Sequence, residues 1–201
     1  LSEELNPNQL TDAEHLWIID PIDGTVNFAH QHSQVAVSIA YYFKGKAQVG
    51  VVHNPFTGET FYACKGMGAY INDTVIQCAK TNELRRALIA TGFPYVKDHL
   101  PKLMRRLETV LTQCADIRRI GSAALDICWV ACGRLDGYYE SVQPWDFAAA
   151  QLIAREAGAQ FGHIHPLPEF NNPELQGEDI IVCVPELFDQ LQSLLEQADK
   201  A

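Results

Sequence analysis

Short runs of β-branched and aromatic residues, separated by glycine-containing turns, fill the first part of the chain. Residues 34–43 (QVAVSIAYYF) and 47–53 (AQVGVVH) read as two strands joined by the turn residues KGK. LWII (16–19) reads as a short buried strand before them, and ETFYACKGMGAYIND (59–73) as a strand, a glycine-rich turn and a second short strand. These runs predict an antiparallel meander that extends through residue 73.

Further along the chain, strand-like segments alternate with segments whose apolar residues recur at helical spacing. Helices are expected at four places: from Pro101, over 121–133, over 146–158 and from Pro185. Strands are expected at 86–93, 116–120, 136–141 and 179–184, and a loop at 163–177. This order predicts layered mixed sheets with helices, with an antiparallel-sheet portion in residues 1–80 and an alternating α/β portion in residues 81–201.

The composition narrows the classes of partner. The formal net charge of the 201 residues is −10, from 25 acidic and 15 basic side chains. An acidic surface repels phosphate backbones, so we expect no direct nucleic-acid partner. No apolar run approaches the length of a membrane span, so no membrane partner is expected. We expect a cytoplasmic protein with free thiols, in which Cys128 and Cys132 pack in the core rather than share a metal.

The segment WIIDPIDGTVNFAH (17–30) carries the most distinctive chemistry. A buried-looking strand ends on Asp20 and Asp23, and two close carboxylates repel each other unless a cation lies between them. Hard oxygen ligands select Mg²⁺, which binds carboxylates together with water and phosphate. Gly24 and Thr25 follow with backbone N–H groups suited to an anion. The alternative interpretation is a plain Asp-Gly turn in which Asp20 is a cap.

Two further acidic positions fit the same interpretation. Asp146 in PWDFAAA opens a predicted helix, where the positive end of the helix dipole favours a carboxylate, although a simple N-cap would explain it as well. Glu3 or Glu4 in SEE could complete a carboxylate cluster, or could be part of a solvated acidic end. Together these positions predict phosphoryl chemistry supported by metal ions.

WIIDPIDGTVNFAH together with PWDFAAAQLIAREAG (144–158) closely resembles the signature segments of the inositol monophosphatase family. GVVHNPFTGETFYACKGMGAYIND (50–73) and RRIGSAALDICWVACGRLDGYYE (118–140) resemble further family segments in the same order, so the resemblance covers essentially all 201 residues. It implies one domain with the layered α-β-α-β-α sandwich of inositol monophosphatase and fructose-1,6-bisphosphatase, an α+β fold. The family's N-terminal helical segment, which supplies a lysine near the site, is expected to be missing from this chain.

The resemblance also implies roles for individual residues. The implied ligands of two or three Mg²⁺ ions are Glu3, Asp20, the Ile22 carbonyl, Asp23 and Asp146. Glu3 and Thr25 would activate the attacking water, and Asp20 would bridge two metals. The implied substrate contacts are Asp23, Gly24, Thr25, Gly121, Ser122, Ala123, Glu140 and Asp146. The role of Glu140 is the least direct, because the four residues between it and Trp145 are one fewer than the family usually has.

The implied activity is Mg²⁺-dependent, in-line hydrolysis of a small phosphate monoester by a metal-activated water. Inositol monophosphate is the expected substrate, and GSAALD with YYE favours it. Fructose 1,6-bisphosphate, histidinol phosphate, a 3′-phosphoadenosine nucleotide and NADP are the alternatives. Some bacterial relatives act instead as interaction proteins of the transcription machinery, and a catalytically inactive remnant is the third interpretation. A homodimer and inhibition by lithium are further implications of the resemblance.

Overall fold

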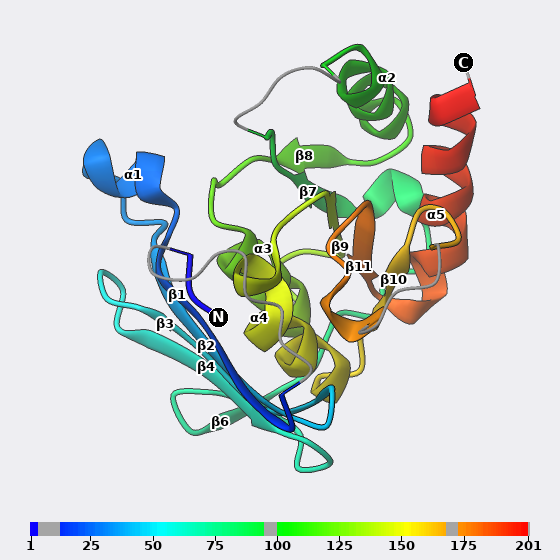
Figure 1. Cartoon of the computed structure of the whole chain (residues 1–201). Coiled ribbons are helices and arrows are strands. Elements are labelled where there is room, and N and C mark those ends of the chain that lie inside the picture. Colours follow the sequence, from blue (N-terminus) through cyan, green and yellow to red (C-terminus); the bar gives the residue numbers. More distant parts are fainter. Residues whose placement is uncertain (4–12, 95–99, 168–172, 201) are drawn as a thin grey trace.

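The computed structural model describes residues 1–3, 13–94, 100–167 and 173–200. Its first sheet is a six-stranded antiparallel meander in which each strand pairs with the next along the chain (Figure 1). Side chains in β2 alternate between buried and half-buried, as expected for strands with one face on the core. The strands are β1 His15–Asp23, β2 Ala36–Phe43, β3 Lys46–Asn54, β4 Glu59–Cys64, β5 Ala69–Ile71 and β6 Thr74–Ile76.

The second sheet is mixed, with five strands in the order β10-β11-β9-β7-β8. Strand β7 pairs in parallel with both β8 and β9, and the pairs β9–β11 and β11–β10 are antiparallel. Strand β11 is buried along its whole length, which agrees with the continuous apolar run IIVC. The strands are β7 Leu88–Thr91, β8 Asp116–Arg118, β9 Gly137–Glu140, β10 Gln160–His163 and β11 Ile180–Cys183.

Helices α3 (Ala123–Ala131) and α4 (Pro144–Glu156) lie between the two sheets (Figure 1). Helices α2 (Leu100–Leu111) and α5 (Pro185–Lys200) pack together on the other side of the second sheet, and the short α1 (Thr25–Ala29) projects beyond the end of β1. Two 3₁₀ turns complete the described elements, Leu84–Arg86 and Pro173–Leu175. None of the described helices is both long and apolar enough to cross a bilayer.

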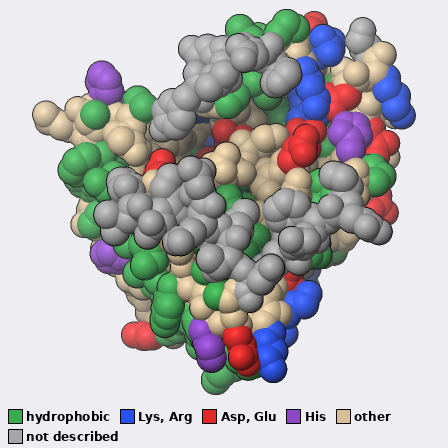
Figure 2. All heavy atoms as spheres, viewed as in Figure 1, with side chains coloured by type: hydrophobic (Ala, Val, Ile, Leu, Met, Phe, Trp, Pro, Cys, Tyr) green, Lys and Arg blue, Asp and Glu red, His purple; other side chains and the backbone are tan. Residues whose placement is uncertain are grey.

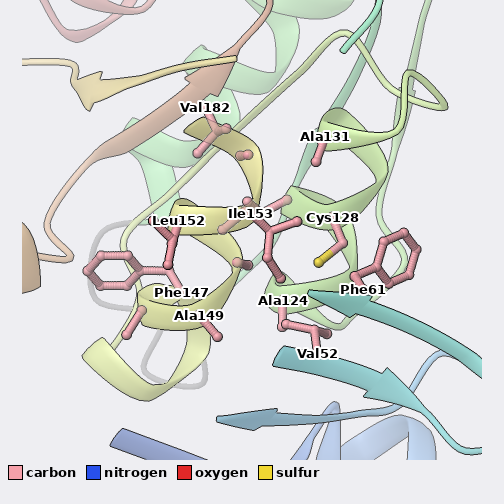
Figure 3. Close-up of a cluster of buried hydrophobic side chains, with 14 of the residues drawn as sticks. Val52, Phe61, Ala124, Cys128, Ala131, Phe147, Ala149, Leu152, Ile153 and Val182 are labelled. Carbon is pink, nitrogen blue, oxygen red and sulfur yellow. The ribbon is translucent and has the colours of Figure 1, made fainter. Parts of the chain in front are cut away.

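The main core forms where α3 and α4 contact the first sheet (Figure 3). Both helices are apolar on nearly every side because sheets cover them from two directions. The approach is close enough to require glycine in β3: a Cβ on Gly50 would lie 2.5 Å from the carbonyl oxygen of Ala149. Cys128 belongs to this core, and all six cysteines are free.

The structure confirms the layered arrangement of mixed sheets and helices, and each predicted strand and helix has a counterpart. Two short strands, one short helix and the two 3₁₀ turns are additional to the predictions: β6, β10, α1, Leu84–Arg86 and Pro173–Leu175. Strand β10 ends on His163, the first residue of the expected loop, and residues 168–172 of that loop lie outside the described residues. Helix α4 begins at Pro144, so Asp146 is the third helical residue and not the residue that opens the helix, as the sequence had suggested.

Candidate active site

An irregularity in β1 brings Asp20 and Asp23 to the same side of the strand. In a regular strand, side chains three residues apart point to opposite faces. The register of β1 with β2 shifts between these two aspartates, where Pro21 has no N–H to donate to the neighbouring strand. Asp20 is 1% exposed and Asp23 is 7% exposed. The DPID segment therefore continues the strand with a bulge and places two carboxyl groups inside the molecule.

Asp146 reaches the same point from α4. Carboxylate oxygens of Asp20, Asp23 and Asp146 all lie within 4.8 Å of one another, a separation that a cation could bridge. The amide of Gln143 donates a hydrogen bond of 2.8 Å to Asp146 Oδ2 and so fixes the side chain at the start of the helix. Two elements far apart in the sequence therefore meet at one group of three acids.

The electrostatics of this group favour a bound cation. Burial, reinforced by the charge of Asp23, raises the pKa of Asp20 to about 8, and burial followed by the same charge raises the pKa of Asp146 to about 9. Asp20 Oδ1 accepts from the amide of Ile22 at 2.9 Å, whereas Asp20 Oδ2 is buried without a hydrogen-bond partner among the described residues. Buried carboxylates without compensation are costly, and a divalent cation with oxygen ligands fits this set of donors.

Helix α3 holds Asp23 from the opposite side. Ser122, the N-cap of α3, donates a hydrogen bond of 2.5 Å to Asp23 Oδ2, and the amide of Ala124 donates another of 2.9 Å. Burial raises the pKa of Asp23 to about 6, and these hydrogen bonds favour its charged form. Asp23 therefore ionises more readily than Asp20 or Asp146.

The turn after Asp23 is fixed by its contacts. Gly24 has φ 91°, and a Cβ there would lie 2.8 Å from the Gln34 carbonyl oxygen, so only glycine fits. Asn27 donates to the carbonyls of Gln34 and Ile120 at 2.8 and 2.7 Å, which ties α1 to the segment that precedes α3. The Thr25 hydroxyl donates to the carbonyl of Ile22 at 3.1 Å.

The described N-terminal residues run beside β1. Ser2 forms an isolated parallel bridge with Ile19, and this contact places Glu3 next to the acidic group. The charge of Glu3 is one of the causes that raise the pKa of Asp20, after burial and the charge of Asp23. Glu3 therefore lies in the same cleft as the acidic group and acts on its electrostatics.

These residues surround one cleft of about 390 Å³. Every position that the sequence analysis singled out as a site residue lines it: Glu3, Asp20, Ile22, Asp23, Gly24, Thr25, Gly121, Ser122, Ala123, Glu140 and Asp146. The structure thus brings the candidates together, while the role of each one remains a prediction. The sheet irregularity, the α3 N-terminus and the α4 N-terminus converge on this cleft.

Glu140 lies at the edge of the cleft, at the end of β9. Burial raises its pKa to about 7, and the Tyr138 hydroxyl donates to Glu140 Oε2 at 2.6 Å. A Cβ on Gly92 would collide with the Glu140 carboxylate, so this glycine makes the room that the side chain needs. Sequence reasoning missed Gly92, and nothing in its local context indicates the role.

Asp126 of α3 is a further acidic residue that sequence reasoning missed. It is 1% exposed, lines the cleft, and its Oδ1 has no hydrogen-bond partner among the described residues. Burial, with the charges of Glu140 and Asp23, raises its pKa well above the ordinary value. An aspartate within the apolar helical segment AALDICWVA was the available signal, because buried acids are rare without a partner.

A second acidic group, His165, Asp179 and Asp199, also has oxygen and nitrogen atoms within reach of one another. Its cations are already supplied by the protein: Arg106, 2% exposed, binds both aspartates, and Lys102 adds a contact of 3.0 Å to Asp179. Figure 2 shows basic, acidic and histidine side chains gathered over the neighbouring ends of α2 and α5. This group is an ion-pair network and is not a comparable metal site.

The comparisons with known proteins agree with this geometry. Residues 1–197 match the model of the inositol monophosphatase family. Nus factor SuhB of Vibrio cholerae is 49% identical over 150 residues, which are 74% of this chain and 56% of that protein. The putative Nus factor SuhB of Neisseria meningitidis is 39% identical over 195 residues, which are 96% of this chain and 73% of that protein.

Solved structures give the same result. Inositol monophosphatase from Anabaena superposes with a TM-score of 0.89 at 36% identity and covers 98% of this chain and 77% of its own. SuhB of Mycobacterium tuberculosis superposes with a TM-score of 0.84 at 37% identity, covering 99% and 76%. The chain spans 56% and 60% of the length of the Nus factor SuhB proteins from V. cholerae and Pasteurella multocida. Fold, cleft and sequence together show that this chain belongs to the inositol monophosphatase family.

Proposed function

We propose that this chain catalyses Mg²⁺-dependent hydrolysis of a small phosphate monoester, with inositol monophosphate as the substrate that fits best. The observation that carries the proposal is the group of three buried carboxylates, Asp20, Asp23 and Asp146, within 4.8 Å of one another. A fold has little reason to bury three mutually repelling acids unless a cation neutralises them. Membership of a phosphatase family supports the same activity.

The residues that would hold Mg²⁺ are Glu3, Asp20, the Ile22 carbonyl, Asp23 and Asp146. When bound, two or three such ions would lower the pKa of a coordinated water and neutralise charge on the phosphate oxygens. Asp20 would be one of the metal ligands, because it lines the cleft and its Oδ2 has no hydrogen-bond partner among the described residues. Asp146 Oδ2 is engaged by an amide, which leaves its other oxygen for the cation.

The chain's own groups would bind and orient the reactants. The Glu3 carboxylate would receive the proton of the attacking water, and the Thr25 hydroxyl would help to orient that water, since both residues line the cleft with Asp20. Backbone N–H groups of Gly24 and Thr25 would bind the phosphate. On the leaving-group side, Glu140 would accept a hydrogen bond from a substrate hydroxyl, and Gly121, Ser122 and Ala123 line the same cleft.

The choice of a polyol phosphate rests on Glu140 and on one relative. Structures similar to this chain include a phosphatase bound to inositol monophosphate and the same phosphatase bound to 2′-AMP, at 30% and 28% identity. Related sugar or nucleotide phosphates therefore stay as alternatives. A substrate panel tests the choice: inositol 1-phosphate, fructose 1,6-bisphosphate, histidinol phosphate, 2′-AMP, 3′-phosphoadenosine 5′-phosphate and NADP. The proposal expects the highest kcat/KM for inositol 1-phosphate, and a nucleotide at the head of the ranking would overturn it.

A second candidate function is an interaction with the transcription machinery. It is supported by relatives of 42–49% identity that are named Nus factor SuhB. Such a role needs a protein partner, because the net charge of −10 disfavours direct contact with nucleic acid. The substitution Asp146→Asn separates the two functions: it should abolish phosphate release and leave co-purification with transcription proteins unchanged. For the phosphatase proposal we also expect three properties implied by the family: a homodimer, a cytoplasmic location and inhibition by lithium.

A further inference from the structure

A short segment connects two of the acids that face the cleft. Residues 141–143, here called the strap, join Glu140 at the end of β9 to Pro144 at the start of α4. The strap has no helix or strand hydrogen bonding of its own. Glu140 directly precedes it, and Asp146 follows it with Pro144 and Trp145 between. The positions of both carboxylates therefore depend on the contacts that fix the strap.

Ser141 is held by Asp179 through two hydrogen bonds. The Ser141 hydroxyl donates to Asp179 Oδ1 at 3.0 Å and accepts from the Asp179 amide at 2.9 Å. The next residue repeats the attachment, because the amide of Val142 donates to the Gly177 carbonyl at 2.9 Å. A Cβ on Gly177 would collide with the Val142 carbonyl, so the two segments are in close contact.

Asp179 is itself fixed by the second layer of helices. Arg106 of α2 donates to both of its carboxylate oxygens, at 2.7 and 2.9 Å, and Lys102 donates to Oδ2 at 3.0 Å. The Asp179 carbonyl accepts from the amide of Ile164 at 2.8 Å. Arg106 also binds Asp199 of α5, so α2 and α5 hold Asp179 as a rigid unit. A bidentate guanidinium pair of this kind gives geometric precision as well as charge neutralisation.

We propose that Ser141 is a positioning residue, through which the Arg106–Asp179 pair sets the strap so that Glu140 and Asp146 face the same cleft. This inference rests on the proposed function of these two acids. Ser141 as a residue is exposed, and its two hydrogen bonds to Asp179 are partly buried, so we expect their loss to affect position more than global stability. In this proposal Ser141 orients the strap, and the Arg106–Asp179 ion pair fixes the position of Ser141.

Three variants of the full chain test this inference: Ser141→Ala, Ser141→Thr and the control Thr112→Ala. The Thr112 hydroxyl, like that of Ser141, donates a hydrogen bond within the protein, here to the Thr109 carbonyl at 2.9 Å, but Thr112 lies outside the cleft. Mg²⁺ binding is measured by isothermal titration calorimetry, and KM for inositol 1-phosphate by phosphate release. For Ser141→Ala we expect Mg²⁺ affinity to fall and KM to rise by about three- to tenfold. This is the effect of about one net hydrogen bond, here the attachment to Asp179 that positions Glu140 and Asp146. Ser141→Thr, which keeps a hydroxyl, should stay within about twofold of the unsubstituted protein.

The outcomes are distinct. Alanine and threonine variants that both match the unsubstituted protein, or that both lose affinity equally, would overturn the positioning role. A loss in the Thr112→Ala control of the same size would show a general effect on the fold, which also overturns it. If the unsubstituted protein binds Mg²⁺ and releases no phosphate from any ester, the proposed function fails, and the calorimetric comparison alone then decides on Ser141. If it binds no Mg²⁺, both proposals fail.

Discussion

Replacing Asp20 by asparagine should make the metal-free protein more stable at neutral pH. The folded chain raises the pKa of Asp20 from 3.8 to about 8 through burial and the charge of Asp23. The folded state therefore binds this proton more tightly than the unfolded state does. The stabilising effect of the proton is fully present below pH 4 and is lost as the pH rises from about 4 to about 8. The side chain of the Asp20→Asn variant carries no charge, so the variant is not subject to that loss.

The size of the effect follows from linkage. One pKa unit corresponds to ~1.4 kcal/mol, so the three units between pH 4 and pH 7 set an upper bound of ~4 kcal/mol. Asparagine keeps an acceptor for the Ile22 amide but buries an NH₂ group at the unpartnered Oδ2 position, which costs ~1–3 kcal/mol at every pH. The pH-dependent part of the difference is thus at most ~4 kcal/mol, and after the constant cost the net gain at pH 7 should be ~1–3 kcal/mol, or roughly 2–12 °C in the melting temperature of a chain of this size.

The assay is thermal melting of both proteins with EDTA at pH 4.5 and pH 7.5, and again with 10 mM Mg²⁺ at pH 7.5. As the pH rises from 4.5 to 7.5 in EDTA, the melting temperature of the asparagine variant should rise relative to that of the unsubstituted protein. Mg²⁺ should then reverse the order, since a ligand at a hundred times its Kd stabilises by ~2.7 kcal/mol and the variant has lost a ligand. A stability difference that is the same at both pH values, together with no response to Mg²⁺, would refute the reasoning.

Two further predictions concern the surroundings of the cleft. Arg106→Met should lower the free energy of unfolding by ~3–5 kcal/mol, measured in urea at pH 7, because it leaves Asp179 and Asp199 next to each other without their buried cation. A loss under ~1 kcal/mol would show that the Arg106–Asp179 ion pair does not anchor this part of the fold. Glu140→Gln should lower kcat/KM for inositol 1-phosphate by about tenfold or more. The kcat/KM for p-nitrophenyl phosphate, which has no hydroxyl to bind, should stay within about twofold. Equal losses for the two esters would argue against a contact of Glu140 with the substrate hydroxyl.

The strands and helices could be predicted because their signals are local. The alternation in residues 36–43 and the apolar face of residues 185–200 depend only on nearby residues. Strand β10 was missed since Gln160–His163 contains no buried residue and carries a glycine, so its pairing with β11 depends on a partner distant in sequence. The division of the chain at residue 80 into two portions stays a prediction.

The candidate site, too, could be predicted only where its signals are local in the sequence. The motif around Asp20 and Asp23 identifies the residues, but the register shift that turns both carboxylates to one side comes from pairing with β2. The placement of Asp146 three residues into α4 depends on the helix beginning at Pro144. Asp126 could be suspected from its place in the apolar segment AALDICWVA, but its position on the cleft is not visible in a local pattern. Ser141 could not be recognised because its role comes from Asp179, which is distant in sequence.

Phosphate release from inositol 1-phosphate is the most direct test of the central claim. It is measured on this chain with 5 mM Mg²⁺ and with EDTA, beside the variant Asp146→Asn at matched concentration. The account predicts release that requires Mg²⁺ and falls by at least about 100-fold in the variant, whose circular dichroism spectrum should be unchanged. Release that persists in EDTA, or that is equal in the variant, would contradict the assignment of the acidic cleft as a metal-dependent phosphatase site.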